Sequence, residues 1–97
     1  MDETTRKDIA DLNRRFLYLV KQLASHGHAT LLTGLPGVAI ERVKKMTLGE
    51  IDDLAENMPA TCFFMRFSEI TFNSLVDHKA NRRAYTINIV SAQQGEE

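Results

Sequence analysis

The sequence of 97 residues lacks several features that would assign a chain to a class of protein at once. It has one cysteine, Cys62, so an internal disulfide framework is excluded and a reducing compartment is expected, although one thiol per chain can still bridge two copies. No apolar run approaches the roughly 18 residues of a membrane-spanning helix, and the acidic start Met-Asp-Glu-Thr-Thr lacks the pattern of a signal peptide. We therefore expect a cytoplasmic protein with no membrane contact.

An excess of charge of one sign is also missing. Twelve basic and thirteen acidic residues give a formal net charge of -1, so the chain as a whole lacks the positive field that draws many nucleic-acid binders to phosphate. Any contact with DNA must come from a local patch or from a partner. A chain of this length is expected to form a single domain, 1–97, and such small domains often gain stability by pairing.

Motifs for catalysis and metal binding are missing as well. His26, His28, His78 and Cys62 do not have the spacing of a zinc site, and the glycines do not form a phosphate-binding loop. Cys62 together with a distant histidine has no local signature of a nucleophile and its base. We expect that the chain is not an enzyme, holds no metal or cofactor, and works by binding other molecules.

The strongest positive pattern predicts a long helix between Arg6 and Ser25. Five apolar residues recur at alternating steps of three and four and so share one stripe: Ile9, Leu12, Phe16, Leu19 and Leu23. Thr5 is expected to cap the start of this helix, and Gly27 lies where it would stop. A dimer seam and an intramolecular core would both produce the stripe, so both interpretations stay open here.

Short helices are expected to follow. A turn or short helix fits 28–34 before the Leu-Pro-Gly break, and an amphipathic helix fits 38–46. Thr47 and Glu50 form a capping box that opens another helix, which Pro59 closes. The helix at 38–46 and the one after Thr47 superficially suggest a helix-turn-helix, but the second carries four acidic groups that would repel phosphate.

Pairs of like charge are interpreted as solvated helix faces: Asp52 with Asp53, Arg14 with Arg15, and Lys44 with Lys45.

Bulky side chains dominate residues 61–67, which we expect to form a buried extended segment, with a helix as the open alternative. Ser68 can cap a following helix that runs to about Lys79. This helix is expected to turn its apolar residues inward, namely Phe72, Leu75 and Val76.

The tail, 77–97, carries the only sizeable charge asymmetry of the chain. No acidic residue lies between Asp77 and Glu96, and this stretch contains side chains suited to phosphates and base edges: Lys79, Arg82, Arg83, Tyr85, Thr86 and Asn88. The β-branched residues from Ile87 to Val90 leave helix and strand both open. We predict that residues 1–76 form a dimerisation and partner-binding core and that the tail contacts DNA.

Three stretches of the chain resemble the FlhD family, the subunit of the flagellar master transcriptional activator. Residues 8–23 open with Asp-Ile-Ala-Asp-Leu-Asn, residues 48–56 end in Leu-Ala-Glu, and Cys62 leads into Met-Arg-Phe at 65–67. The order and spacing of these motifs carry the resemblance. It implies an all-α, homodimeric domain with a long first helix, short helices after it, and a carboxyl-terminal tail like a helix-turn-helix.

The resemblance also implies partners. An FlhC-type subunit would carry the zinc site, and the heteromeric complex would bind promoter DNA as an activator, with RNA polymerase as a further candidate partner. In the family the carboxyl-terminal region contacts DNA, and its His-Thr segment is similar to Tyr85-Thr86 here. The family's cysteine, which can bridge two copies, is matched by Cys62. This chain is shorter near its end, like the FlhD-like subunits of conjugative elements, which favours transfer genes over flagellar genes as targets.

We therefore predict a dimer and partner interface of eight residues: Ile9, Leu12, Phe16, Leu19, Leu23, Cys62, Phe64 and Phe67. The alternative function is that of a protein-only adaptor or anti-activator, which would bind a transcription factor without touching DNA.

Overall fold

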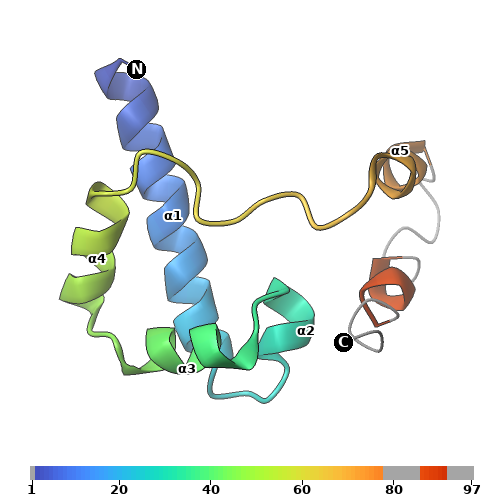
Figure 1. The fold of residues 1–97 in the computed structure, drawn as a ribbon, viewed down its shortest axis with the longest axis horizontal. Coiled ribbons are helices and arrows are strands. Elements are labelled where there is room, and N and C mark those ends of the chain that lie inside the picture. The colour runs from blue at the N-terminus through green and yellow to red at the C-terminus, as the bar shows by residue number, and fades with distance from the viewer. Residues whose placement is uncertain (1, 78–85, 92–97) are drawn as a thin grey trace. The chain divides into compact units, whose positions relative to one another are not determined.

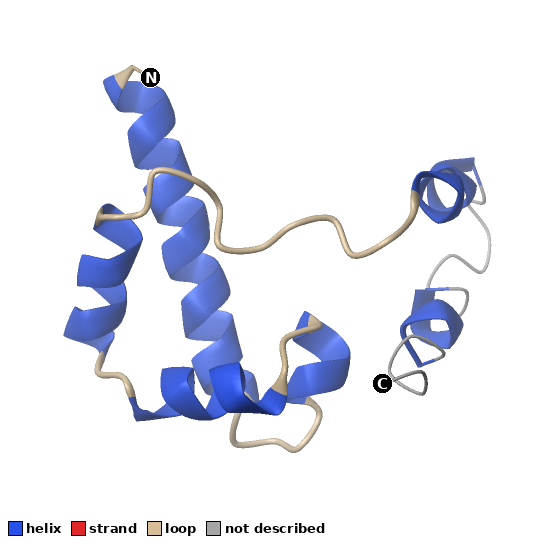
Figure 2. Cartoon of the chain, viewed as in Figure 1, coloured by secondary structure: helices blue, strands red, loops and turns tan. Residues whose placement is uncertain are grey.

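The computed structural model describes residues 2–77 and 86–91, and all regular structure in these two stretches is helical (Figure 1, Figure 2). The helices are α1 (Glu3–Leu23), α2 (Ala29–Thr33), α3 (Gly37–Lys45), α4 (Leu48–Glu56) and α5 (Glu69–Asp77), and residues 86–91 are also helical. The predicted all-α class is confirmed. None of the described helices is both long enough and apolar enough to cross a membrane. The chain divides into two compact units, Met1–Phe64 and Met65–Glu97, which are described separately.

The first helix begins earlier than predicted. Asp2 caps α1, and its Oδ1 accepts a hydrogen bond of 2.8 Å from the backbone N–H of Thr5. The predicted cap at Thr5 is wrong because the carboxylate one turn earlier already supplies the acceptor that the free N–H groups of a helix start require. The helix ends at Leu23, and Gly27 in the following turn has a φ of 78°, a left-handed conformation that favours glycine.

Local capping signals predicted the starts of two later helices correctly. Thr47 and Glu50 form the full capping box of α4: the Glu50 N–H donates to Thr47 Oγ1 at 3.1 Å, and the Thr47 N–H donates to Glu50 Oε1 at 2.9 Å. Ser68 precedes α5, where its Oγ accepts from the Thr71 N–H at 3.2 Å. These contacts lie within three residues of one another, which is why the sequence alone reveals them.

The first unit has one apolar core, to which α1, α2, α3 and α4 all contribute (Figure 1). Its buried residues are Leu17, Val20, Ala29, Ile40, Val43 and Ile51. The α4 helix packs along α1, and α3 lies against the second half of α1. There Lys21 donates through Nζ to the carbonyls of Lys44 at 2.8 Å and Met46 at 2.6 Å, satisfying acceptors that the end of α3 leaves free.

The buried face of α1 is not the predicted stripe. It consists of Ala10, Asn13, Leu17 and Val20, and lies next to the predicted stripe on the helix surface. Two members of the predicted stripe are about half exposed, Leu12 at 49% and Leu19 at 47%. The interpretation of that stripe as the core of this chain is therefore wrong for these two leucines.

An ion-pair network joins α1 to α4. The Arg14 guanidinium contacts Asp11 at 2.7 Å on its own helix, and Asp52 at 3.0 Å and Glu56 at 2.6 Å on α4. The Tyr18 hydroxyl donates to the same Asp52 carboxylate, and this hydrogen bond raises the pKa of Tyr18 because it favours the protonated phenol. The solvated-face interpretation is therefore wrong for Arg14 and Asp52.

Acidification is expected to weaken the starts of α1 and α4. Hydrogen bonds from Thr5 lower the pKa of Asp2, and hydrogen bonds from Thr47 lower the pKa of Glu50. A carboxyl whose pKa is lower in the folded than in the unfolded state contributes its full stability above its ordinary pKa of about 4, and loses it as the pH falls through the lowered pKa. The melting temperature should therefore fall as the pH drops from about 5 towards about 2.

The variant that tests this combines Asp2→Asn with Glu50→Gln, because neutral amides can still accept the capping hydrogen bonds. Its melting temperature, followed by circular dichroism, should depend less on pH than that of the parent chain. Asp53→Asn, at an exposed position of α4, is the matched control. An equal acid-induced drop in the parent and the double variant would contradict the assignment.

Candidate partner-binding surface

A buried asparagine attaches the segment after α4 to the first helix. Asn13 is 0% exposed. Its Nδ2 donates to the carbonyl of Ala60 at 2.9 Å, and its Oδ1 accepts from the N–H of Cys62 at 2.8 Å. A buried amide is stable in an apolar core only when its hydrogen-bonding groups are paired. Asn13 therefore fixes where residues 60–62 cross α1.

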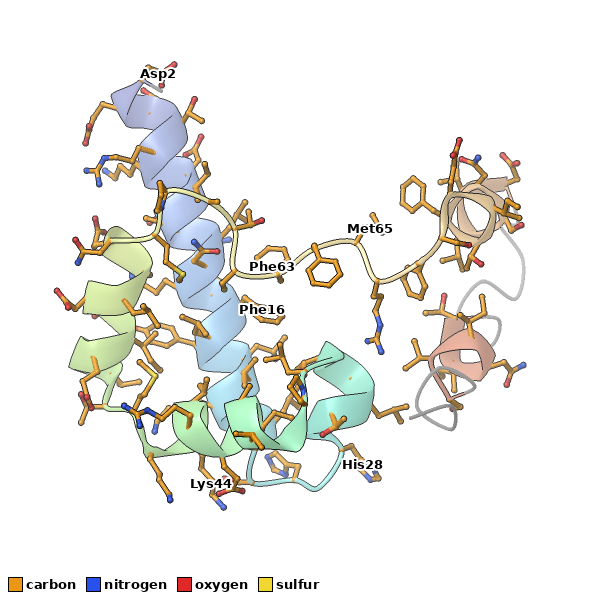
Figure 3. The ribbon with its side chains drawn as sticks, viewed as in Figure 1. Asp2, Phe16, His28, Lys44, Phe63 and Met65 are labelled. Atoms are coloured by element: carbon orange, nitrogen blue, oxygen red, sulfur yellow. The ribbon has the colours of Figure 1, made fainter. Side chains whose placement is uncertain are left out.

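This crossing places an aromatic ring on the predicted stripe. Phe63, next after the fixed segment, packs on Phe16 of α1 with 4.8 Å between ring centroids and 31° between ring planes (Figure 3). Centroid distances of this size are typical of favourable aromatic pairs. The chain thus covers the middle of its own stripe at Phe16 and leaves Leu12 and Leu19 about half exposed on either side along α1.

Phe64 is the most exposed large apolar side chain among the residues that the structure describes, at 90%. The prediction that residues 61–67 form a buried extended segment is therefore wrong in its burial: Phe64 and Met65 are exposed, and Cys62 and Phe63 are half-buried. The helical alternative is also wrong, because no residue of this segment is helical (Figure 2). Near the start of the segment, the N–H of Cys62 donates to Asn13 Oδ1, so this backbone group needs no partner from a helix or a sheet.

Cys62 is the one predicted interface residue with reactive chemistry. Its thiol is free and half-buried, and burial raises its pKa. A cysteine reacts as a nucleophile and forms disulfides in its deprotonated form, the thiolate. A raised pKa lowers the fraction of thiolate at neutral pH, and so slows oxidation and disulfide exchange at Cys62. The structure favours a packed thiol, which contacts the apolar core of the first unit.

In the second unit, Phe67 lies in a small apolar groove of about 430 Å³. The other lining residues are Met65, Phe72, Leu75 and Val76. The guanidinium of Arg66 lies 5.9 Å from the centroid of the Phe67 ring, within the range of a cation–π contact. The prediction that α5 turns its apolar residues inward is wrong for Phe72 and Val76, which are 42% and 53% exposed, whereas Leu75 is half-buried.

The predicted DNA-contacting residues fall largely outside the part of the chain that the structure describes. Four of them are not among residues 2–77 and 86–91: Lys79, Arg82, Arg83 and Tyr85. Thr86 and Asn88 belong to the helical stretch 86–91, in which Asn88 is exposed and Val90 is 8% exposed. The sequence left helix and strand both open for Ile87 to Val90, and the structure shows a helix there.

Sequence reasoning missed Asn13 and Phe63 as organisers of this surface. The only signal for Asn13 was its place in the Asp-Leu-Asn motif, because a polar residue inside an apolar helix face does not by itself reveal its partners.

Among the described residues, 2–77 and 86–91, no group of three or more His, Cys, Asp or Glu side chains could hold a metal ion. Comparisons with protein-family models, curated proteins and solved structures found no match.

Proposed function

We propose that this chain is a subunit of a heteromeric, DNA-binding transcriptional activator of the FlhDC kind, which acts with an FlhC-type partner on conjugative-transfer or flagellar genes. The observation that supports the proposal best is the exposure of two leucines on the outer stripe of α1: Leu12 is 49% and Leu19 is 47% exposed. Apolar side chains that lie exposed along one stripe of a helix are suited to packing against a partner helix.

The spacing of this face indicates a helical partner. Leu12 and Leu19 are seven residues apart on α1, which is one heptad of a helix that packs against another helix. Phe63 covers Phe16 between them, so the two leucines are the open positions of this stripe. Arg15, an exposed cation, lies on α1 between the two leucines. A partner helix with apolar residues at the same spacing and an acidic residue beside them would be complementary to this face.

In this proposal the tail supplies the contact with DNA, through Lys79, Arg82, Arg83, Tyr85, Thr86 and Asn88. Changing Arg82 and Arg83 together to alanine is expected to flatten the salt dependence of DNA binding. The slope of the logarithm of the binding constant against the logarithm of the salt concentration should become smaller in magnitude by about 1.8, since each lost phosphate contact removes about 0.9. Fluorescence anisotropy of promoter DNA, with the partner present, measures this slope across a series of salt concentrations.

Lys44→Ala with Lys45→Ala is the matched control for that experiment. Both lysines are exposed on α3, so the control removes the same charge from another part of the chain. The assignment of the tail fails if the arginine variant binds as tightly, and with the same salt slope, as the parent complex.

The proposal as a whole is tested by a gel shift of promoter DNA with this chain alone, with the FlhC-type protein alone, and with both together. A shift that requires both proteins supports a heteromeric activator. A stable protein complex without any shift would instead favour the adaptor or anti-activator. The exposed apolar face also gives that second function its support, because it fits a protein partner whether or not DNA is bound.

A further inference from the structure

A strap, residues 60–63, holds an aromatic ring over the position of the α1 stripe that separates the two exposed leucines. Its backbone is fixed by the two hydrogen bonds of Asn13, and its last residue, Phe63, packs on Phe16 at 4.8 Å between ring centroids (Figure 3). Within the strap, Thr61 Oγ1 donates to the carbonyl of Phe63 at 2.8 Å. The strap and α1 belong to the same compact unit, so the ring pair is a contact within one folded body.

Phe63 lies where a helix packed along the stripe would place its own side chains. Leu12 and Leu19 are seven residues apart, about 10.5 Å along a helix, and Phe16 lies between them. A helix that contacts both leucines passes over Phe16 at an interaxial distance of about 8–10 Å, and side chains fill the space between the two axes. The Phe63 ring already covers Phe16 in that space. The strap and the partner helix are therefore alternative occupants of one position.

The strap is less buried than the helices of the same unit. Cys62 and Phe63 are half-buried. Ala60 and Thr61 are exposed, whereas Ile51 of α4 is 0% exposed. A segment with few buried contacts opens locally at a lower free energy than the core. The strap can therefore leave α1 while the four helices of the unit stay packed.

We propose that the strap is an autoinhibitory contact: Phe63 leaves Phe16 before a helix with apolar residues at heptad spacing packs along the whole stripe of α1. This inference deepens the proposed function, on which it rests for the kind of partner, by assigning a means of regulation to the same surface. Because only molecules with an open strap bind, the apparent affinity for the partner is the intrinsic affinity reduced by the open fraction. A change that releases the strap should therefore tighten binding.

A synthetic peptide tests this competition without the FlhC-type protein and without DNA. The peptide is an amphipathic helix of three heptads with leucine at a and d, and its glutamates at e and g oppose self-pairing and complement the exposed Arg15. Its fluorescence anisotropy, in titrations with the full chain, measures the affinity. Phe63→Ala should bind about tenfold more tightly than the parent chain, since the aromatic pair no longer holds the strap closed. Asn13→Ala releases the strap at its other end and should change the affinity in the same direction.

The labelling rate of Cys62 by a thiol reagent reports the state of the strap in the same samples. Cys62 belongs to the strap and is half-buried while the strap is closed, so saturating peptide should speed its labelling in the parent chain. Phe64→Ala is the matched control, because it removes the same ring from the next residue, which is 90% exposed. This variant should bind the peptide like the parent.

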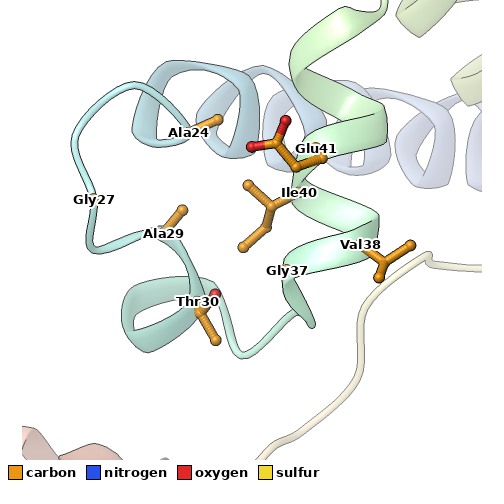
Figure 4. A pocket seen from close by; sticks show the side chains of 8 residues that line it. All are labelled: Ala24, Gly27, Ala29, Thr30, Gly37, Val38, Ile40 and Glu41. Carbon is orange, nitrogen blue, oxygen red and sulfur yellow. The ribbon is translucent and has the colours of Figure 1, made fainter.

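A second open apolar feature of the first unit requires a control for the place of binding. It is a groove of about 400 Å³ between the end of α1, α2 and α3, and Val38 and Ile40 are among its lining residues (Figure 4). Leu19→Ala should weaken peptide binding, with or without Phe63→Ala, because it truncates the stripe. Val38→Ala truncates an 84% exposed side chain at the groove and should leave binding unchanged.

Helix content measured by circular dichroism confirms that each variant is folded. The proposal is overturned if Phe63→Ala binds the peptide no more tightly than the parent, if saturating peptide slows the labelling of Cys62, or if the peptide binds neither chain. It is also overturned if Val38→Ala weakens binding and Leu19→Ala does not. Because these measurements involve neither the FlhC-type protein nor promoter DNA, the gel shift of the heteromeric complex decides the proposed function separately.

Discussion

Replacing Ile51 with alanine is expected to lower the free energy of unfolding by about 2–5 kcal/mol, the usual range for truncating a fully buried isoleucine. Ile51 is 0% exposed and belongs to the core cluster through which α4 packs along α1. Loss of three carbon atoms there removes apolar burial and leaves a cavity. Because a domain of this size has only about 5–15 kcal/mol of stability, the variant should be near its unfolding threshold.

Urea unfolding followed by circular dichroism at the helix band measures this effect. Leu48→Ala is the matched control on the same helix, since Leu48 is 59% exposed and should change the stability by no more than about 0.5 kcal/mol. Equal midpoints for the two variants would mean that α4 does not pack through Ile51.

Replacing Asn13 with alanine is expected to lower the free energy of unfolding by about 2–3 kcal/mol. The change removes both hydrogen bonds that fix residues 60–62 on α1, one to the Ala60 carbonyl and one from the Cys62 N–H. Each such bond contributes about 1 kcal/mol net, and a buried group left without a partner costs more than that. The segment should then separate from α1 while the core helices remain packed.

The labelling rate of Cys62 by a thiol reagent reports this separation directly. Burial raises the pKa of the thiol in the parent chain, so release of the segment should bring the pKa back towards its ordinary value and speed labelling at neutral pH. Asn73→Ala, at an exposed position of α5, is the control and should label like the parent. Unchanged labelling in Asn13→Ala would show that other contacts hold the segment.

The elements that the sequence predicted well are those set by short-range chemistry. The capping box of Thr47 and Glu50 and the cap at Ser68 depend on residues three positions apart, and the pattern of helices follows from periodicity and from breaks at proline and glycine. The cap of α1 was misplaced because Asp2 and Thr5 are both good capping residues and only the backbone decides between them.

The choice of buried face on α1 could not be predicted from periodicity. Apolar residues occupy two adjacent stripes of this helix, and the heptad count favoured the one that contains Leu12 and Leu19. The core uses the other, which contains the small Ala10 and the polar Asn13. Asn13 is buried because backbone groups 47 and 49 residues away pair with it, and pattern reasoning within one helix cannot detect partners so distant.

The charged residues show the same limit. Arg14 was interpreted as solvated because its neighbours in sequence suggested a wet helix face, yet its contacts with Asp52 and Glu56 join residues 38 and 42 positions apart. Most of the candidate DNA contacts lie outside the described residues, so that part of the site stays a prediction from charge asymmetry and from the resemblance to the FlhD family.

The absence of buried residues in α5 has a consequence for local unfolding. This helix has nine residues, fewer than the roughly 12–15 that an isolated helix needs to be even marginally stable in water. With Ile70 81% exposed and no residue buried, its backbone amides are expected to exchange hydrogen through local opening and not through global unfolding. A protein that covers Ile70 would add protection to these amides first, so α5 can serve as the internal reporter of binding.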